Sequence, residues 1–430
     1  MSQQSSEASQ KHHHVDGSPC RLCGTPLEKT FLDLGMSPPC ESFVTAAQLT
    51  EMEPYYPLHV LVCDHCFLVQ LPEHVKPENI FVDYAYFSSF STSWVEHARR
   101  YCEMIRNRLA LGPQSRVFEI ASNDGYLLQH FLPMGIPVTG IEPAANVAEA
   151  ARKKNIPTIV EFFGRKLAER LVKEGARADL IIGNNVLAQV PDLNDFAAGM
   201  AHLLAPEGVI TLEFPHLERL IAENQFDTIY HEHFSYFSFV TIAELARRHG
   251  LKVFDVEKLP THGGSLRVYL CRKDANHAIT PAVGDLLADE RQKGFLEPGT
   301  YANFAPQVHR TKRRLLEFLI KCKDSGKKIC GYGAPGKGNT LLNYCGIGTD
   351  FLDFTVDRNP YKHGRFTPGM HIPIHPVSAI DEARPDYLLV LPWNLKQEIA
   401  AQLRYTADWG CKLIIPIPEV HVIDPREVAP

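Results

Sequence analysis

Residues 116–131 read RVFEIASNDGYLLQHF and predict a strand, a tight turn and a helix in succession. The apolar run RVFEIA is typical of a buried strand, and Gly125 allows the turn to approach neighbouring backbone closely. A strand followed by a helix is the unit from which doubly wound α/β sheets are built. The stretch therefore predicts an α/β fold whose ligand binds at the carboxyl end of this strand.

The alternation of strands and helices continues after this stretch. Strands are predicted at VTGIE (138–142), TIVE (158–161), ADLIIGNN (178–185) and GVITLEF (208–214). Helices are predicted near residues 125–133, 144–154, 164–174 and 193–204. The segments LKVFDVEKL (251–259) and HGGSLRVYLCR (262–272) predict an antiparallel closing pair. We therefore expect a mostly parallel sheet with helices on both faces.

A second, smaller α/β unit is predicted after residue 281. Residues 281–326 are helical and charged in composition, and strand patterns then return. These later strands are KICGYG (328–333), DFTVD (353–357), DYLLVL (386–391) and CKLIIPIP (411–418). The sequence is therefore divided into a disordered lead-in (1–17), a cysteine-containing module (18–82), a central Rossmann-like domain (83–280), and a linker helix with a smaller Rossmann-like domain (281–430).

The composition argues against several classes of protein. The chain has 430 residues, 45 % of them hydrophobic, so it can bury the cores of about two or three domains. The net charge of −6 argues against general nucleic-acid binding, which needs an excess of Lys and Arg. Neither an apolar run of roughly 18 residues nor a signal peptide is recognisable. We therefore expect a cytoplasmic protein with neither nucleic acid nor membrane as a partner.

Four of the eleven cysteines form two Cys-x-x-Cys pairs, CRLC (20–23) and CDHC (63–66). Without a secretory signal, this pattern predicts a four-cysteine zinc site rather than disulfides. The expected ligands are Cys20, Cys23, Cys63 and Cys66. Four thiolates leave no open coordination position, so we expect the zinc to be structural.

Acidic residues end two neighbouring predicted strands, Glu119 on the first and Glu142 on the second. An acidic group at the end of the second strand of such a sheet holds ribose hydroxyls. The NAD fingerprint G-x-G-x-x-G is absent from the intervening turn, and Glu119 would repel a pyrophosphate. The site suits a ligand with a cationic centre, such as S-adenosylmethionine, and a polar turn without a ligand is the alternative. The candidate residues are Glu119, Ser122, Asn123, Asp124, Gly125, Glu142, Pro143, Asn184 and Asn185.

The loop CGYGAPGKGNT (330–340) fits more than one use. Its glycines spell the dinucleotide fingerprint G-x-G-x-x-G, which leaves an NAD-linked function open. With Lys337 the loop nearly spells a P-loop, but Gly338 stands where that motif needs a hydroxyl to hold Mg²⁺. A purely structural turn is the third interpretation.

The stretch TIYHEHFSYFS (228–238) concentrates ionisable and aromatic side chains. A zinc-protease helix is excluded because Ser235 occupies the second histidine position of H-E-x-x-H. A metal bound by His231 and His233, or a packed core, remains an alternative. Core packing is disfavoured because each consecutive polar group would need a buried partner. An acid–base centre is favoured, since a neutral histidine with an ordinary pKa of about 6.5 is a natural general base.

Taken together, these motifs resemble those of S-adenosylmethionine-dependent C-methyltransferases that act on nucleotide-linked 4-keto deoxysugars. The match extends over nearly the whole chain. It rests on the two cysteine pairs and on YAYFSSFS (84–91), EIASNDGYLL (119–128), GIEPAANVA (140–148), NNVLAQVPD (184–192), YHEHFSYFS (230–238), HGGSLRVY (262–269) and GYGAPGKGNTLLNYCGI (331–347). The resemblance implies an N-terminal zinc-binding part, a central methyltransferase domain and a C-terminal α/β domain. Two positions differ from the family pattern: Ala121 replaces a common glycine, and Gln189 a frequent histidine.

The resemblance also implies a mechanism for the central motif. The expected catalytic residues are His233, Tyr230, Glu232 and His231. His233 would remove the proton next to the sugar ketone, and the resulting carbanion would take the methyl group of S-adenosylmethionine at C3 or C5. Tyr230 or His231 would stabilise the enolate oxygen, and Glu232 would orient an imidazole.

A nucleotide-sugar substrate is expected in a cleft between the central and C-terminal domains. The expected substrate-binding residues are Tyr84, Tyr86, Gly336, Lys337 and Asn339. The carrier would be TDP or GDP, and the enzyme a monomer or weak dimer. Two other functions remain open: an NAD(P)-dependent oxidoreductase or epimerase of nucleotide sugars, and a non-catalytic protein that binds a partner through its zinc-containing scaffold.

Overall fold

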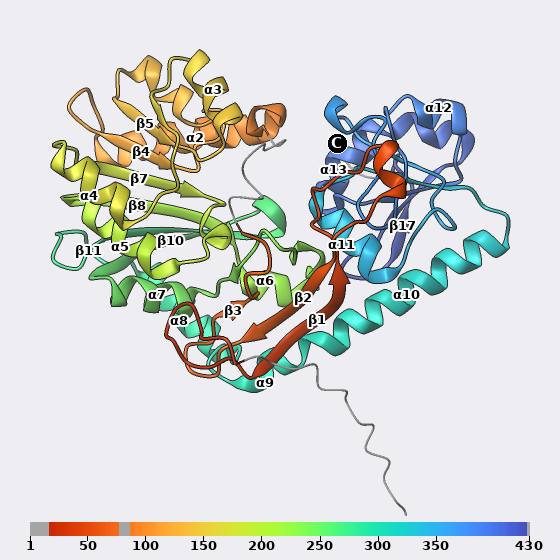
Figure 1. Cartoon of the computed structure of the whole chain (residues 1–430), viewed down its shortest axis with the longest axis horizontal. Coiled ribbons are helices and arrows are strands. Elements are labelled where there is room, and N and C mark those ends of the chain that lie inside the picture. Colours follow the sequence, from red (N-terminus) through yellow and green to blue (C-terminus); the bar gives the residue numbers. More distant parts are fainter. Residues whose placement is uncertain (1–16, 77–86, 428–430) are drawn as a thin grey trace, which may run out of the picture.

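The computed structural model describes residues 17–76 and 87–427, and it contains three sheets (Figure 1). The central sheet has seven strands in the order β10-β11-β8-β7-β4-β5-β6. These strands are β4 (Val117–Ile120), β5 (Val138–Ile141), β6 (Thr158–Ile159), β7 (Ala178–Asn184), β8 (Leu204–Pro215), β10 (Leu251–Leu259) and β11 (Ser265–Arg272). Strands β4 to β8 are parallel, and β11 is antiparallel to both of its neighbours, as predicted.

Amphipathic helices precede the first of these strands or connect them. They are α2 (Thr92–Leu109), α3 (Ala145–Lys153), α4 (Arg165–Lys173), α5 (Leu193–Leu203), α6 (Leu217–Ala222) and α7 (Phe239–Arg248). Helix α2 begins after Ser91, whose hydroxyl caps the Trp94 amide, and it buries Ala98, Cys102 and Ile105 at helical spacing. Three of the four predicted helices of this domain are confirmed.

The helix predicted near residues 125–133 is wrong. Two short 3₁₀ turns, Leu128–His130 and Leu132–Met134, occupy this segment instead. Gly125 has a left-handed φ of 74°, and Pro133 has no N–H to donate within an α-helix. These two residues leave too short a run between them for regular helical hydrogen bonding.

The N-terminal sheet recruits a strand from the middle of the chain. It has the order β1-β2-β3-β9, formed by β1 (Lys29–Ser37), β2 (Tyr56–Val62), β3 (Val69–Gln70) and β9 (Ser235–Tyr236). Strand β9 pairs antiparallel with β3, with Gln70 opposite Ser235. The sequence did not predict this pairing, which attaches the segment TIYHEHFSYFS to the cysteine-containing module.

The C-terminal sheet forms the second α/β unit, with the order β14-β13-β12-β15-β16-β17. Its strands are β12 (Ile329–Tyr332), β13 (Thr355–Val356), β14 (Ile374–His375), β15 (Tyr387–Val390), β16 (Lys412–Ile415) and β17 (His421–Ile423). Its helices are α11 (Gly336–Cys345), α12 (Ala379–Ala383) and α13 (Lys396–Gln402). The four predicted strands are confirmed, whereas the short edge strands β14 and β17 were not predicted.

Helices α8 (Pro281–Gln292), α9 (Pro298–Ala302) and α10 (Phe304–Asp324) connect the two α/β units. Figure 1 shows β1 and β2 below and between these units, with α10 running along the lower side of β1 and of the C-terminal unit. The ring of Phe31 in β1 stacks on Phe304 in α10 at 4.9 Å, and both belong to a core shared with the C-terminal sheet. Within the described ranges, no helix is long and apolar enough to cross a membrane.

Candidate active site and zinc centre

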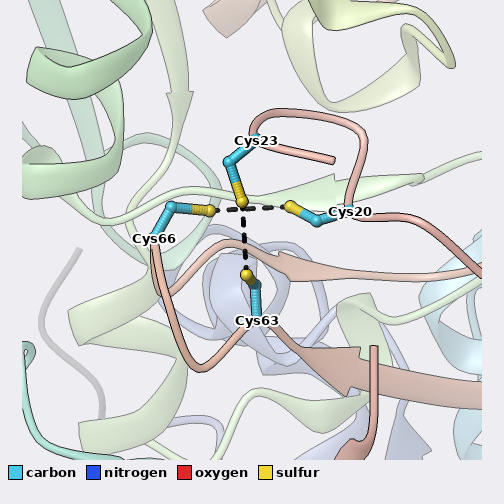
Figure 2. A group of neighbouring side chains, drawn as sticks. All are labelled: Cys20, Cys23, Cys63 and Cys66. Atoms are coloured by element: carbon cyan, nitrogen blue, oxygen red, sulfur yellow. Dashed lines mark hydrogen bonds between the residues drawn. The ribbon is translucent and has the colours of Figure 1, made fainter. Parts of the chain in front are cut away.

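The two cysteine pairs converge on one point, as Figure 2 shows. The four ligand sulfurs lie within 4.8 Å of one another, with 3.5 Å between Cys20 and Cys66 and between Cys23 and Cys63. Tetrahedral zinc with Zn–S bonds of about 2.3 Å places its sulfurs about 3.8 Å apart, so the cluster fits this ion. Gln70 Nε2 donates a hydrogen bond to the Cys20 sulfur at 3.1 Å and so orients one of the expected zinc ligands.

The zinc centre is joined to the central motif through Arg21, which lies within the first cysteine pair. The Arg21 guanidinium donates to the carbonyl oxygens of Phe234 and Leu71, the latter at 2.9 Å. The guanidinium carbon also lies 5.4 Å from the centre of the Phe234 ring. Phe234 directly follows His233. The N-terminal cysteine-containing module therefore fixes the backbone next to His233, although it contributes no histidine to the cavity.

A cavity of about 520 Å³ lies at the carboxyl ends of the central strands. Ile120, Glu142, Asn184 and Pro215, at or next to the ends of β4, β5, β7 and β8, line one part of it. Other parts of its lining come from the N-terminal module, from the segment after α6, and from the start of α11. Among the candidate site residues, the cavity is lined by Asn123, Glu142, Pro143, Asn184, Asn185, Tyr230, Glu232, His233, Gly336 and Lys337.

The carboxylate of Glu142, next to the end of β5, is held in place by backbone amides. Glu142 accepts hydrogen bonds from the Ala144 and Asn123 amides at 2.9 and 3.0 Å, and burial raises its pKa. The side-chain nitrogen and oxygen of Asn184 are buried and have no hydrogen-bond partner among the described residues. These polar groups at the cavity wall fit the ribose hydroxyls and the amino-acid end of S-adenosylmethionine.

Four of the candidate donor residues are not among those that line the cavity: Glu119, Ser122, Asp124 and Gly125. Glu119 is buried, and burial together with the nearby Glu142 carboxylate raises its pKa well above the ordinary value. Asp124 is 3.2 Å from the Lys154 ammonium. At Gly125 an added Cβ would lie 2.2 Å from the Ile156 side chain, so this glycine is needed for packing. Their expected contact with the donor stays a prediction.

Glu142→Ala is expected to weaken the binding of S-adenosylmethionine about 10- to 150-fold. A hydrogen bond to a charged group contributes about 1.5–3 kcal/mol, and the variant loses the carboxylate that would receive the ribose hydroxyls. Calorimetric titration measures the affinity, and Glu149→Ala, at an exposed position of α3, is the matched control. Equal affinities of the wild type and Glu142→Ala would contradict this assignment.

His233 is presented to the cavity as an uncharged imidazole. Its Nδ1 lies 3.0 Å from the Thr228 carbonyl oxygen, which can only accept, so Nδ1 carries the proton and Nε2 has the lone pair. Burial, with Lys337 and His262 nearby, lowers the His233 pKa to about 4. The ring is held against Tyr230 with its centre 4.0 Å from the Tyr230 ring centre. This geometry leaves Nε2 unprotonated at neutral pH.

The two residues before His233 have other surroundings than the sequence predicted. His231 does not line the cavity; its Nε2 lies 3.3 Å from the Pro57 carbonyl oxygen, and its ring packs on Tyr56. These contacts hold His231 against β2, so its expected role at the enolate oxygen stays a prediction that this arrangement does not favour. Glu232 lines the cavity but lies beside Cys40, with 4.0 Å between Oε1 and Sγ, and not beside an imidazole.

The neutral form of Glu232 is favoured by its surroundings. Burial, followed by the charge of Glu41, raises the Glu232 pKa to about 8, although Lys362 opposes this shift. A carboxyl group that stays protonated near neutral pH can donate a hydrogen bond to a ligand. The structure therefore gives Glu232 a donor's chemistry rather than that of an anion that orients histidine.

Glu232 is expected to make the folded state less stable as the pH rises from about 4.5 to 8. The pKa of Glu232 is higher in the folded state than in the unfolded state. Its contribution to the free energy of unfolding is therefore complete below the unfolded-state pKa of about 4.5, and it is lost as the pH rises toward the folded-state pKa of about 8. A shift of this size corresponds to at most about 5 kcal/mol. Denaturant unfolding at pH 5 and pH 8 should show a smaller loss for Glu232→Gln than for the wild type. The exposed control Glu382→Gln should lose as much as the wild type.

The C-terminal unit contributes the start of α11. Gly336 and Lys337 line the cavity, and the Lys337 ammonium lies 3.1 Å from Asn394 Oδ1 and 5.0 Å from the Trp393 ring centre. An added Cβ at Gly336 would lie 2.9 Å from the Cys40 sulfur, so the glycine admits this segment of the N-terminal module. Asn339 does not line the cavity, because its amide donates to the Cys40 carbonyl at 2.6 Å.

The last candidates are two tyrosines and the glycine loop that left an NAD-linked function open. Tyr84 and Tyr86 lie outside the described residues. Asp357 directly follows β13, at the position where a dinucleotide-binding fold holds ribose, but its carboxylate accepts from the backbone amides of Ala334 and Asn359, both at 2.7 Å. This internal use of Asp357 disfavours an NAD site at the C-terminal glycine loop.

The cavity also contains residues that were not selected from the sequence. Cys40 and Glu41 reach it from the connection between β1 and β2, Trp94 from α2, and His262 from the connection between β10 and β11. The motif HGGSLRVY contained a signal for His262, because its two glycines mark a constrained loop. Cys40 and Glu41 are far in sequence from every other cavity residue, and no local pattern indicates them.

Comparison with solved structures finds methyltransferases over part of the chain. The glycopeptide N-methyltransferase MtfA is 16% identical with a TM-score of 0.34, covering 41% of this chain and 96% of that one. Magnesium protoporphyrin IX methyltransferase (ChlM) from Synechocystis PCC 6803 is 14% identical with a TM-score of 0.32, covering 45% of this chain and 88% of that one.

Sequence comparison covers almost the whole chain. Three family models match in succession: "Putative zinc binding domain" at residues 20–81, "Methyltransferase domain" at 94–256 and "C-methyltransferase C-terminal domain" at 260–418. C-methyltransferase NovU from Streptomyces niveus is 35% identical over 404 residues, which are 94% of this chain and 96% of that protein. The chain belongs to this family of zinc-containing, S-adenosylmethionine-dependent C-methyltransferases.

Proposed function

We propose that the chain transfers a methyl group from S-adenosylmethionine to a ring carbon, C3 or C5, next to the 4-keto group of a TDP- or GDP-linked deoxysugar. One observation carries the proposal: His233, uncharged and with Nε2 available, lines the same cavity as Glu142 and Asn184. A carbon nucleophile must be made by removing a proton, and a carbonyl group is what makes such a proton acidic. The match to a C-methyltransferase along 94% of the chain supports this chemistry.

His233 would take the proton from the carbon next to the ketone, and the electron pair of that C–H bond would form the enolate. The cofactor supplies an electrophilic methyl group on its sulfonium. Tyr230, whose ring lies against His233 at a tilt of 34°, is the proposed donor to the enolate oxygen, and neutral Glu232 is proposed to donate to a sugar oxygen. The walls of the cavity would hold the carbon and the methyl group at near-attack distance.

The diphosphate of the substrate is proposed to lie at the start of α11. Backbone N–H groups and the positive end of the helix dipole attract anions there, and Lys337 adds a charge at the same end. Burial lowers the Lys337 pKa, and an arriving phosphate would favour its charged form. This placement directs the sugar toward His233, which lines the same cavity.

Methyl transfer to a panel of TDP- and GDP-linked 4-keto deoxysugars tests the proposal. Pure zinc-containing protein is incubated with each sugar and with donor labelled in its methyl group, and NMR locates the new methyl. Labelled methyl on a carbon next to the ketone is the expected result. Failure to methylate any member, or reduction and epimerisation of the sugars with NAD(P), would contradict the proposal and favour the oxidoreductase alternative.

A further inference from the structure

His262 lies on a tightly constrained loop between β10 and β11, and its side chain lines the cavity that contains His233. The backbone of His262 is left-handed, with φ 54° and ψ 21°. Left-handed backbone costs a non-glycine residue about 1–2 kcal/mol. Such strain persists where the surroundings enforce it, and it is common at functional sites.

Hydrogen bonds on both sides of His262 hold this loop. The Thr261 hydroxyl donates to Glu213 Oε1 at 2.9 Å, and Gln225 Nε2 donates to the Gly263 carbonyl at 2.7 Å. An added Cβ at Gly263 would lie 2.7 Å from that same nitrogen of Gln225. The loop can therefore neither carry a larger residue there nor move away from the cavity without losing both bonds.

The imidazole itself is held by Trp94 of α2. The two rings meet edge to face at 5.1 Å and 83°, and Trp94 stacks on His97 at 4.9 Å. His97 Nε2 in turn lies 3.0 Å from Glu213 Oε2. The buried carboxylate of Glu213 thus supports His262 by two routes, through the loop and through the indole.

Neither ring nitrogen of His262 has a hydrogen-bond partner in the described part of the chain. The His262 side chain is exposed to the open cavity, and desolvation by the surrounding protein lowers its pKa to about 4; the charges of Lys337 and His97 act in the same direction, and Glu213 opposes them. The ring is therefore uncharged near neutral pH, and one of its nitrogens carries a proton it can donate. A neutral imidazole aimed at a carbonyl oxygen polarises that carbonyl.

We propose that His262 is a second catalytic residue of this cavity, which donates a hydrogen bond to the substrate ketone while His233 removes the neighbouring proton. The inference rests on the proposed function and extends it. The C–H bond breaks, its proton goes to Nε2 of His233, its electron pair forms the C=C bond, and the carbonyl π pair moves to the oxygen held by His262. When the carbon takes the methyl group, the carbonyl re-forms, the sulfonium becomes a neutral thioether, and His233 returns its proton to solvent.

Lys337 is less suited to this task than His262. Its ammonium is held by Asn394 and by the ring of Trp393, and it stands at the helix start that suits the diphosphate. Tyr230 provides the other donor, so the enolate oxygen would receive bonds from two loops. Removing one of two such donors typically lowers the rate about 10²–10³-fold.

The test compares His262→Phe, which keeps a ring without a donor, with His262→Gln, which restores an N–H. Exchange of the sugar's α-proton with deuterated solvent is followed by NMR without methyl donor, using the panel sugar that the wild type methylates. Methyl transfer is measured separately. His262→Phe should lower both rates about 10²–10³-fold, and His262→Gln should recover at least about tenfold of the loss.

Controls separate chemistry from packing. The melting temperature and the affinity for S-adenosylmethionine should be unchanged in His262→Phe and His262→Gln. If the phenylalanine does not fit, His262→Leu serves as a second variant without a donor. His421→Phe on the exposed edge strand β17 should retain wild-type rates. Wild-type exchange in the donor-free variants, or equal losses in the Phe, Leu and Gln variants, would overturn the proposed role of His262. Neither result would contradict the proposed function. A wild type that methylates no sugar would instead overturn the proposed function.

Discussion

Replacing His233 with alanine is expected to lower turnover about 10²–10⁴-fold while both ligands still bind. The expectation follows from the state of the ring: Thr228 fixes the proton on Nδ1, and Nε2 is left as the basic nitrogen of an uncharged imidazole. Single-turnover methyl transfer at saturating donor and sugar measures the chemical step, and calorimetry measures binding.

His231→Ala is the matched control for this experiment. It removes a second buried imidazole two residues away, but one that contacts β2 at Pro57 and does not line the cavity. We expect it to lower stability while turnover per folded molecule stays within about threefold of the wild type. If instead His233→Ala retains wild-type turnover, the base is another residue, and Tyr230 and Glu232 would be tested next.

A defect in proton removal must be separated from a defect in binding, because both lower product formation. Exchange of the α-proton with deuterated solvent isolates proton removal, provided the wild type catalyses it without methyl donor. His233→Ala should lose this exchange at saturating sugar. An unchanged rate would show that the residue acts after the enolate is formed.

The central fold was predictable because its determinants are local. Buried strands such as β4 are short, mostly apolar runs, and the polar turn after β4 marks its carboxyl end. The cysteine pairs likewise predicted their own cluster, since each pair grips an ion from one tight turn. The positive φ of 56° at Ala121 shows why a glycine is common there, although no pattern in this sequence alone reveals that strain.

The orientation of side chains in irregular segments was not predictable. His231, Glu232 and His233 are adjacent in sequence, yet His231 packs on β2, whereas Glu232 and His233 line the cavity, the first beside Cys40 and the second with its proton fixed by Thr228. Their directions are set by the β3–β9 pairing, which joins residues more than 160 positions apart. Only a long-range contact of this kind distinguishes a base from a packed histidine.

The same physical reason explains why several cavity residues were missed. Cys40 and Glu41 come from the N-terminal module, and they reach the cavity because Asn339 binds the Cys40 carbonyl and Gly336 leaves room for it. Asn339 was expected to bind the substrate, and in the structure its amide nitrogen holds this segment. The position of a polar residue beside a glycine-rich loop therefore does not reveal whether it binds a ligand or another segment of the chain.

Cys63→Ala is expected to remove zinc, to lower stability by at least about 4 kcal/mol and to lower turnover, although no zinc ligand lines the cavity. The loss of turnover follows from Arg21 and β3, which fix Phe234 and Ser235 directly after the proposed base. Cys322→Ala, a buried cysteine on α10 outside the cluster, is the matched control and should retain zinc and turnover.

Elemental analysis, thermal unfolding and hydrogen exchange at the amides of residues 230–236 measure the three consequences separately. A structural zinc predicts that exchange in this segment speeds up together with zinc loss, because the segment is held by a module that needs the metal to fold. Full turnover in a zinc-free Cys63→Ala variant would show that the β3–β9 pairing forms without the metal. The position of His233 would then depend on the Ala188 carbonyl, which accepts from the Phe234 amide at 2.7 Å, and not on the zinc centre.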